Sequence, residues 1–179
     1  MNIKQITSAD LPALRDLAEQ TFRDAWQQMN EPEPFEAYCR EHFTIKKLAA
    51  ELAAPDSEFY FAVLDEQPVA YLKLNLKRNP HPDAPKDWTG TPLQIERIYV
   101  RQDAQGQRIG ERLLGFTENR ARETGAVWVW LSAWQKSPRT IRFYEKNGYE
   151  IFGVETFWVG DDPQPDWLLR KRVCLKSLA

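Results

Sequence analysis

The chain contains few of the residues that mark several common protein classes. Only two of its 179 residues are cysteine, Cys39 and Cys174, and they lie far apart rather than in a Cys-x-x-Cys pair. This argues against a disulfide framework and against a zinc site, and it makes a reducing cytoplasm the expected location. The two histidines, His42 and His81, also lack the spacing of metal ligands. We therefore expect no bound metal.

Long apolar runs and a charge excess are also missing. No stretch approaches the length of a membrane span, and residues 1–6 lack the apolar core of a signal peptide. The 24 basic and 26 acidic side chains nearly cancel. A membrane partner is therefore not expected, and a nucleic-acid partner is disfavoured because binding to phosphate backbones needs a basic surface.

The composition is that of an ordinary globular protein. Hydrophobic residues make up 42% of the chain, which excludes disorder as a whole. At this length one domain, residues 1–179, can bury a full core.

Periodicity and turn residues predict the order of the elements. The expected strands are 2–6, 58–64, 69–76, 93–100, 127–133, 150–159 and 167–175. The expected helices are one that follows Ser8, a region over 35–54 interrupted near Thr44, 111–123 and 137–147. The proline-bearing loop 77–91 is expected to be mobile or to face a ligand. This β-α-α-β-β-β-α-β-α-β-β order predicts an α/β protein with a mixed sheet and helices on both faces.

The most informative segment lies between a predicted strand and a predicted helix. Residues 105–110 read Gln-Gly-Gln-Arg-Ile-Gly. A glycine-bearing turn at a helix start presents unpaired N–H groups and partial positive charge, which suits a phosphate or pyrophosphate. The segment is neither a Walker loop nor a dinucleotide fingerprint, because Gly-Lys-Ser/Thr and Gly-x-Gly-x-x-Gly are both absent.

A second motif follows at a suitable distance. Residues 143–149 read Phe-Tyr-Glu-Lys-Asn-Gly-Tyr. Together the two segments resemble the Gln/Arg-x-x-Gly-x-Gly/Ala and Phe-Tyr-x-x-x-Gly-Phe/Tyr motifs of the GNAT acetyltransferases, with Arg108 in place of the central glycine. The closest resemblance is to PaiA-type polyamine N-acetyltransferases, and it covers nearly the whole chain, from residues 19–26 to residues 157–162.

The resemblance implies a GNAT fold, an acetyl-CoA cosubstrate and a set of coenzyme-binding residues. The loop would hold the pyrophosphate, the backbone of the preceding strand would pair with the pantetheine arm, and Ser137 would donate a hydrogen bond. The residues implied are Ile98, Tyr99, Val100, Gln105, Gly106, Gln107, Arg108, Ile109, Gly110 and Ser137.

Acetyl transfer to an amine also needs an acid and a base. Tyr144 is the candidate acid, because a phenol is protonated at neutral pH and can give a proton to a departing thiolate. The alternative is a half-buried structural tyrosine. Glu96 is the candidate base, on the opposite strand face from Ile95, Arg97 and Tyr99. An ion pair at Glu96, with water as the base, is equally compatible with the sequence.

Two further groups of side chains, one aromatic and one acidic, are candidates for either the core or the site. Trp128, Trp130 and Trp134 share one strand face and suit a core, with Trp134 the one that could approach a ligand. Three aspartates on the closing strands could attract a polycation or simply form a solvated turn; they are Asp161, Asp162 and Asp166.

These features predict an acyltransferase that uses acetyl-CoA to acetylate a primary amine of a small molecule, with a polyamine such as spermidine or spermine as the first candidate. A peptide or protein acceptor keeps the same chemistry. A non-catalytic module that binds acyl-CoA is the alternative outside enzymes. The sequence does not fix the assembly, and a homodimer is compatible with it.

Overall fold

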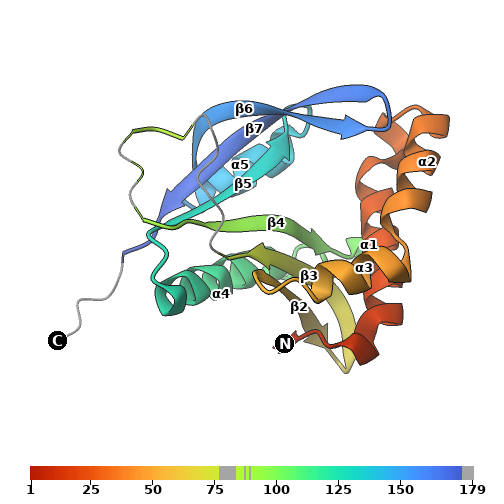
Figure 1. Cartoon of the computed structure of the whole chain (residues 1–179), viewed down its shortest axis with the longest axis horizontal. Helices are drawn as coiled ribbons and strands as arrows, with labels where there is room; N and C mark the ends of the chain where they lie inside the picture. Colours follow the sequence, from red (N-terminus) through yellow and green to blue (C-terminus); the bar gives the residue numbers. More distant parts are fainter. Residues whose placement is uncertain (77–83, 87, 89, 175–179) are drawn as a thin grey trace.

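The computed structural model describes residues 1–76, 84–86, 88 and 90–174, and within them one mixed sheet organises the chain (Figure 1). Its strand order is β1-β2-β3-β4-β5-β7-β6, antiparallel throughout except between β4 and β5. The strands are β1 Asn2–Gln5, β2 Ser57–Leu64, β3 Gln67–Asn75, β4 Leu93–Val100, β5 Trp128–Trp134, β6 Glu150–Val159 and β7 Asp162–Arg172. The predicted mixed α/β architecture is confirmed.

Helices cover both faces of the sheet, as expected. They are α1 Leu11–Trp26, α2 Pro32–His42, α3 Ile45–Leu52, α4 Ile109–Thr124 and α5 Pro138–Lys146, with 3-10 turns η1 Ser8–Asp10, η2 Gln27–Met29 and η3 Gln102–Ala104. Helices α1 to α3 pack on one face against Phe59, Phe61 and Tyr71. Helices α4 and α5 pack on the other, against residues such as Leu72 and Leu131. Neighbouring residues Tyr71 and Leu72 thus belong to different cores, as strand alternation requires.

The sheet opens between β4 and β5. The two strands pair in parallel only at Leu93 with Val129 and at Gln94 with Trp130. Beyond that point they diverge toward α1, and the divergence is visible in Figure 1. Residues 95–100 of β4 therefore have no partner strand on the β5 side within the described chain, so their outward backbone groups are available to something else.

Several element boundaries differ from the sequence prediction. Helix α2 begins at Pro32 rather than at residue 35, because Pro32 and Pro34 lie in its first turn, where proline is tolerated. The predicted interruption is confirmed: Thr44 caps α3 by accepting a hydrogen bond from Lys47 N at 3.2 Å. Strand β7 begins at Asp162, because the segment placed in the acidic turn instead pairs with β6.

The loop over 77–91 is described only in part. Residues 77–83, 87 and 89 lie outside the described residues, so the expectation of mobility is untested there. Trp88 itself is buried and packs on Trp128, with ring centroids 5.6 Å apart, and on Phe152. Trp88 and Trp128 thus belong to a third core cluster, together with Trp130 and Leu168. Trp128 and Trp130 of β5 therefore serve as packing residues, as expected.

A buried ionic network fastens α3 to the sheet. Lys73 of β3 is only 5% exposed, and its Nζ lies 2.8 Å from Glu51 Oε2 of α3. Arg97 of β4 donates to the same carboxylate from Nη1 at 2.8 Å and from Nη2 at 3.1 Å. Burial opposes ionisation of Glu51, but Arg97 and Lys73 together lower its pKa below the usual value. Two cations thus share this carboxylate.

We expect Glu51→Gln to lower the free energy of unfolding by about 3 kcal/mol, because it removes one of the two carboxylates that neutralise Lys73 and Arg97 and leaves both cations to Glu96. Urea denaturation at pH 7 measures the loss. Since the pKa of Glu51 is lowered in the folded state, its contribution is present above the unfolded pKa and is lost as the pH falls through the folded one. The difference between variant and wild type should therefore shrink in acid.

Glu41→Gln is the matched control. Glu41 is 73% exposed in its side chain, and its oxygen is 3.8 Å from Lys47 Nζ. Exposed pairs of this kind contribute within about 0.5 kcal/mol. Equal effects of the two substitutions would show that the buried network does not stabilise the fold.

Candidate functional site

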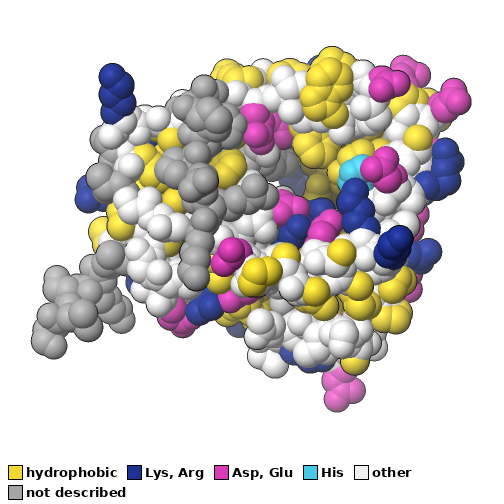
Figure 2. Space-filling model, viewed as in Figure 1, with side chains coloured by type: hydrophobic (Ala, Val, Ile, Leu, Met, Phe, Trp, Pro, Cys, Tyr) yellow, Lys and Arg dark blue, Asp and Glu magenta, His cyan; other side chains and the backbone are white. Residues whose placement is uncertain are grey.

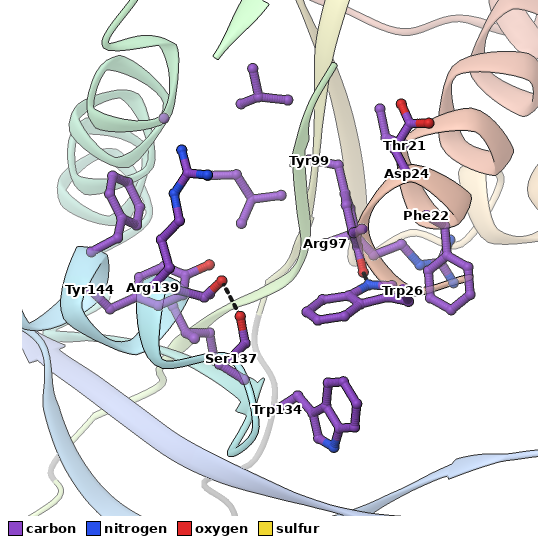
Figure 3. A pocket seen from close by; sticks show the side chains of 18 of the residues that line it. Thr21, Phe22, Asp24, Trp26, Arg97, Tyr99, Trp134, Ser137, Arg139 and Tyr144 are labelled. Atoms are coloured by element: carbon purple, nitrogen blue, oxygen red, sulfur yellow. Dashed lines mark hydrogen bonds between the residues drawn. The ribbon is translucent and has the colours of Figure 1, made fainter. Parts of the chain in front are cut away.

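A cavity of about 730 Å³ occupies the opening between β4 and β5. Its walls come from α1 and η2 on one side, α5 and the start of α4 on the other, and the β6–β7 hairpin at the far end. Figure 2 shows a hollow near the centre of one face, with acidic and basic side chains gathered at its rim. Figure 3 shows Ser137, which precedes α5, and Arg139 and Tyr144 of α5 opposite Phe22 and Trp26 of α1.

The loop that precedes α4 forms one end of this cavity. Gln105, Gly106, Arg108, Ile109 and Gly110 all line it, whereas the exposed Gln107 is not among the lining residues. Gly106 and Arg108 have positive φ angles of 82° and 57°. The turn therefore curls tightly into the first turn of α4, where backbone N–H groups are unpaired and the helix dipole is positive.

Arg108 takes the conformation that favours glycine. It is the N-cap of α4 and has left-handed φ and ψ angles of 57° and 23°. For a residue with a side chain this costs about 1 kcal/mol. The backbone path expected of a central glycine is thus kept in spite of the replacement, and the side chain adds a positive charge to this end.

Gly110 is fixed by its contact with the second motif. A Cβ atom at this position would lie 3.0 Å from Cζ of Phe143 on α5. So close an approach leaves no room for a side chain on that side. The two motifs that are separate in the sequence therefore touch each other at the same wall of the cavity.

Two cationic side chains line the cavity near α4 and α5. Arg108 belongs to the loop, and Arg139 extends from the first turn of α5 toward α4 (Figure 3). Ser137 also lines the cavity, but its Oγ donates to Thr140 Oγ1 at 2.8 Å instead of capping the helix backbone. Arg139 was not identified as a site residue from the sequence. The one indication was its position in the first turn of α5, two residues after the predicted coenzyme-binding residue Ser137.

The middle of the cavity is lined by Ile98, Tyr99 and Val100 on the open edge of β4 and by Tyr144 on α5. Tyr144 is 5% exposed, and burial raises the pKa of its phenol well above the usual value. Its ring contacts Phe143 and Tyr149 at centroid distances of 5.3 and 5.6 Å. Tyr144 therefore stays protonated at neutral pH and faces the cavity.

Glu96 lies at an irregularity that the sequence did not reveal. The register between β3 and β4 shifts so that Lys73 pairs with Arg97 and Leu74 with Ile95, which leaves Glu96 as an extra residue. For this reason the predicted parity holds for Ile95 but is wrong for Arg97 and Tyr99, which share the face of Glu96. Ile95 packs in the core beneath α4, whereas Arg97 reaches Glu51 of α3 on the other face.

The contacts of Glu96 favour the ion-pair interpretation over the base. Its Oε1 lies 2.7 Å from Lys73 Nζ, and its Oε2 accepts from the side chain of Asn75. Arg97 also contacts this carboxylate, with its Nη2 3.3 Å from Glu96 Oε1. Glu96 still lines the cavity. Both of its carboxylate oxygens are, however, already engaged by donors of the protein itself.

The far end of the cavity is aromatic. Trp26 at the end of α1 donates from Nε1 to the Tyr99 hydroxyl at 3.1 Å, and its ring meets Trp134 edge-on at 5.6 Å (Figure 3). Tyr99 in turn stacks on Tyr71 at 5.7 Å. Phe157 of β6 completes this wall. Trp134 thus faces the cavity, as the sequence allowed, while Trp26 was not singled out.

The three aspartates of the closing hairpin do not form one cluster. Asp161 and Asp162 are exposed at the hairpin turn, as expected for a solvated turn. Asp166 is 7% exposed and lines the cavity together with Gln164. It pairs in register with Trp134 of β5 and Glu155 of β6. Its burial is unexpected from the sequence, because the extra residues of β7 could not be told from a turn.

Two absences can be stated for the described residues alone. None of their helices is both long and apolar enough to cross a bilayer. In the same part of the chain, no group of three or more His, Cys, Asp and Glu side chains is arranged to hold a metal ion.

Comparisons with known proteins place the chain in a family. The profile of the acetyltransferase (GNAT) family matches residues 11–149. An uncharacterised N-acetyltransferase of the pepI 3′ region of Lactobacillus delbrueckii subsp. lactis is 33% identical over 171 residues, 96% of each chain. The spermidine N(1)-acetyltransferase of Thermoplasma acidophilum is 21% identical over 155 residues, 84% of this chain and 89% of that protein.

A solved structure agrees with this placement. The PaiA N-acetyltransferase from Thermoplasma acidophilum, in complex with coenzyme A, superposes with a TM-score of 0.73 at 20% identity, over 96% of this chain and 99% of that one. At that identity the likeness concerns the fold alone. The profile match and the Lactobacillus relative establish the family: the chain belongs to the GNAT family, and it is an acetyltransferase that uses acetyl-CoA.

Proposed function

We propose that the protein acetylates a primary amine of a small molecule, with a polyamine such as spermidine as the first acceptor to test. The observation that carries this is the polarity of the cavity. Arg108, Arg139 and one carboxylate, Glu111, lie by the loop and leave that end with an excess of positive charge, whereas Asp24, Asp166 and the aromatic residues lie toward α1 and β7. An anionic cosubstrate and a cationic acceptor would thus each meet groups of opposite charge.

Acetyl-CoA fits the residues at the first end. The turn over 105–110 offers backbone N–H groups at a helix N-terminus, Gly106 leaves open space at its Cβ position, and Arg108 and Arg139 add positive charge. Residues 98–100 present an open strand edge that suits the amides of an extended arm. When bound, acetyl-CoA supplies the activated acetyl thioester.

The chain itself would hold and move the protons. Tyr144 keeps a proton on Oη at neutral pH and is assigned as the general acid. An ammonium cannot act as a nucleophile, so its proton must leave first. Glu96 was the expected acceptor, and its two engaged oxygens make it a better candidate for fixing β4 than for taking that proton.

Two observations support a polyamine as the acceptor. The relative from Thermoplasma acidophilum is a spermidine N(1)-acetyltransferase by name, and the acidic aromatic end of the cavity suits an ammonium. A peptide amine would use the same chemistry. We propose further that residues 1–179 act as one domain in the cytoplasm.

An acceptor panel tests the proposal directly. Acetyl-CoA is incubated with spermidine, spermine, butylamine and a short peptide with a free N-terminus, and the products are identified by mass spectrometry. We expect acetylated polyamine as the main product. Acetylation of the peptide alone would move the acceptor to proteins, and binding of acetyl-CoA without any product would favour the non-catalytic module.

The phosphate loop is tested at Gly110. We expect Gly110→Asp to weaken acetyl-CoA binding by roughly tenfold or more, because it forces bulk against Phe143 in the wall of the cavity and adds a negative charge to the first turn of α4, where the helix dipole would bind a phosphate. Titration calorimetry measures the dissociation constant. Gly115→Asp is the control, since Gly115 is exposed on the same helix and has nothing within 4 Å of its Cβ position. Equal affinities in the two folded variants would remove the loop from the site.

The acid is tested at Tyr144. We expect Tyr144→Phe to lower kcat by roughly a hundredfold with little change in acetyl-CoA affinity, because only the proton donor is lost. Tyr149→Phe is the matched control: Tyr149 is equally buried beside Tyr144, but it does not line the cavity. Full turnover by Tyr144→Phe, with chemistry limiting the rate, would return this residue to a structural role.

A further inference from the structure

The described carboxylates that line the cavity are Asp24, Glu96, Glu111 and Asp166, and of these Asp166 is the buried one. Glu96 is paired with Lys73 and is therefore already neutralised within the protein. Asp166 lines the same cavity and is buried, yet among the described residues no Lys, Arg or His lies within ion-pair distance of it. A buried charge without a partner is costly, so it calls for an explanation.

The described groups that act on Asp166 from β4, β5 and β6 are neutral or acidic, while the exposed Lys136 lies against the ring of Trp134. Glu155 of β6 lies opposite Asp166 in register, and the hydroxyl of Ser132 on β5 is a hydrogen-bonding partner. The charge of Asp166 also helps to raise the pKa of the Tyr99 phenol on β4, although burial of that phenol is the main cause. Asp24 of α1 lines the same cavity. Burial first, then the charge of Glu155, raises the pKa of Asp166 to about 7, and Ser132 lowers it by less.

The aromatic residues beside Asp166 suit a cation. Trp134 is its register partner on β5, and Trp26 meets Trp134 edge-on. Lys136 already places Nζ 5.6 Å from the centre of the Trp134 ring, which shows that this ring accepts a cation. A buried carboxylate without a cationic partner, in register with one indole and in the same cavity as a second, is a suitable receptor for an alkylammonium.

We propose that Asp166 binds the ammonium group of the acceptor and acts as the general base that removes its proton. This inference rests on the proposed N-acetyltransferase function and assigns the base within it. One N–H bond of the ammonium breaks and one O–H bond forms on an Asp166 carboxylate oxygen. The electron pair stays on nitrogen, so the products are a neutral amine and a neutral carboxylic acid.

The electrostatic surroundings suit this exchange. The ion pair of ammonium and carboxylate becomes two neutral groups in a site that penalises charge, so burial favours the transfer. A base with a pKa of about 7 is ionised in large part at cellular pH and remains basic enough to take a proton. The oxygens of Glu96, by contrast, are already engaged by Lys73 and Asn75.

The experiment compares Asp166→Asn with wild type and with Asp161→Asn, an exposed neighbour outside the cavity. Rates with spermidine and with butylamine are measured from pH 5.5 to 9. Wild type should show kcat/KM rising with pH and bending near pH 7, because Asp166 must be ionised to accept the proton. Asp166→Asn should lose that bend and fall by roughly a hundredfold. Asp161→Asn should match wild type.

Binding and stability measurements distinguish a role of Asp166 in holding the acceptor from a purely structural one. Calorimetry should show unchanged acetyl-CoA affinity in Asp166→Asn and a weakened affinity for spermidine. Asp166→Asn should also be more resistant to heat than wild type at pH 8, but not at pH 4. The raised pKa makes the folded wild type lose stability as the pH rises through about 7.

Two failures are distinguishable. If wild type acetylates an amine and Asp166→Asn does so within twofold and with the same pH profile, the role of Asp166 is wrong while the function stands. If wild type acetylates neither amine nor the peptide and binds no amine, the proposed function fails and the inference fails with it.

Discussion

The separation of β4 from β5 is the constraint on which the rest of the site depends. Parallel pairing ends after two residue pairs, at Leu93 and Gln94, so the sheet continues as two diverging halves. Unpaired strand edges are normally avoided in folded proteins. Here the open edge borders a cavity of about 730 Å³ that both the α4 loop and the β6–β7 hairpin can reach. Without the divergence, the two ends of the site would have no common space.

The ionic network explains how an open strand is held in place. The extra residue at Glu96 turns β4, and Lys73 and Arg97 link that turn to Glu51 of α3. The same network neutralises Glu96. The ion pairs of Lys73 and Arg97 thus fix β4 in place. Asp166 of β7, in contrast, has no cationic partner among the described residues. The contrast between these two carboxylates is electrostatic and comes from their neighbours rather than from their chemical type.

Local sequence signals predicted the fold and the loop end of the site well. Caps such as Thr44, glycine-bearing turns and strand periodicity act over a few residues, so they can be recognised without the structure. The rest depends on long-range register. The parity error at Glu96 arose from one inserted residue, and Asp166 was placed in a turn because β7 pairs further than its prolines suggested. Trp26 and Arg139 come from helices whose faces toward the cavity are set only by packing.

The approach of Gly110 to Phe143 has a consequence for how the family can vary. A side chain at position 110 would meet the ring at 3.0 Å, so the packing admits a larger residue at one position only with a smaller one at the other. The two motifs are therefore a single unit in evolutionary terms, although more than thirty residues separate them in the printed sequence. In related chains these two positions should change together, and a loop exchanged between such chains should function only when its partner residue on α5 is exchanged with it.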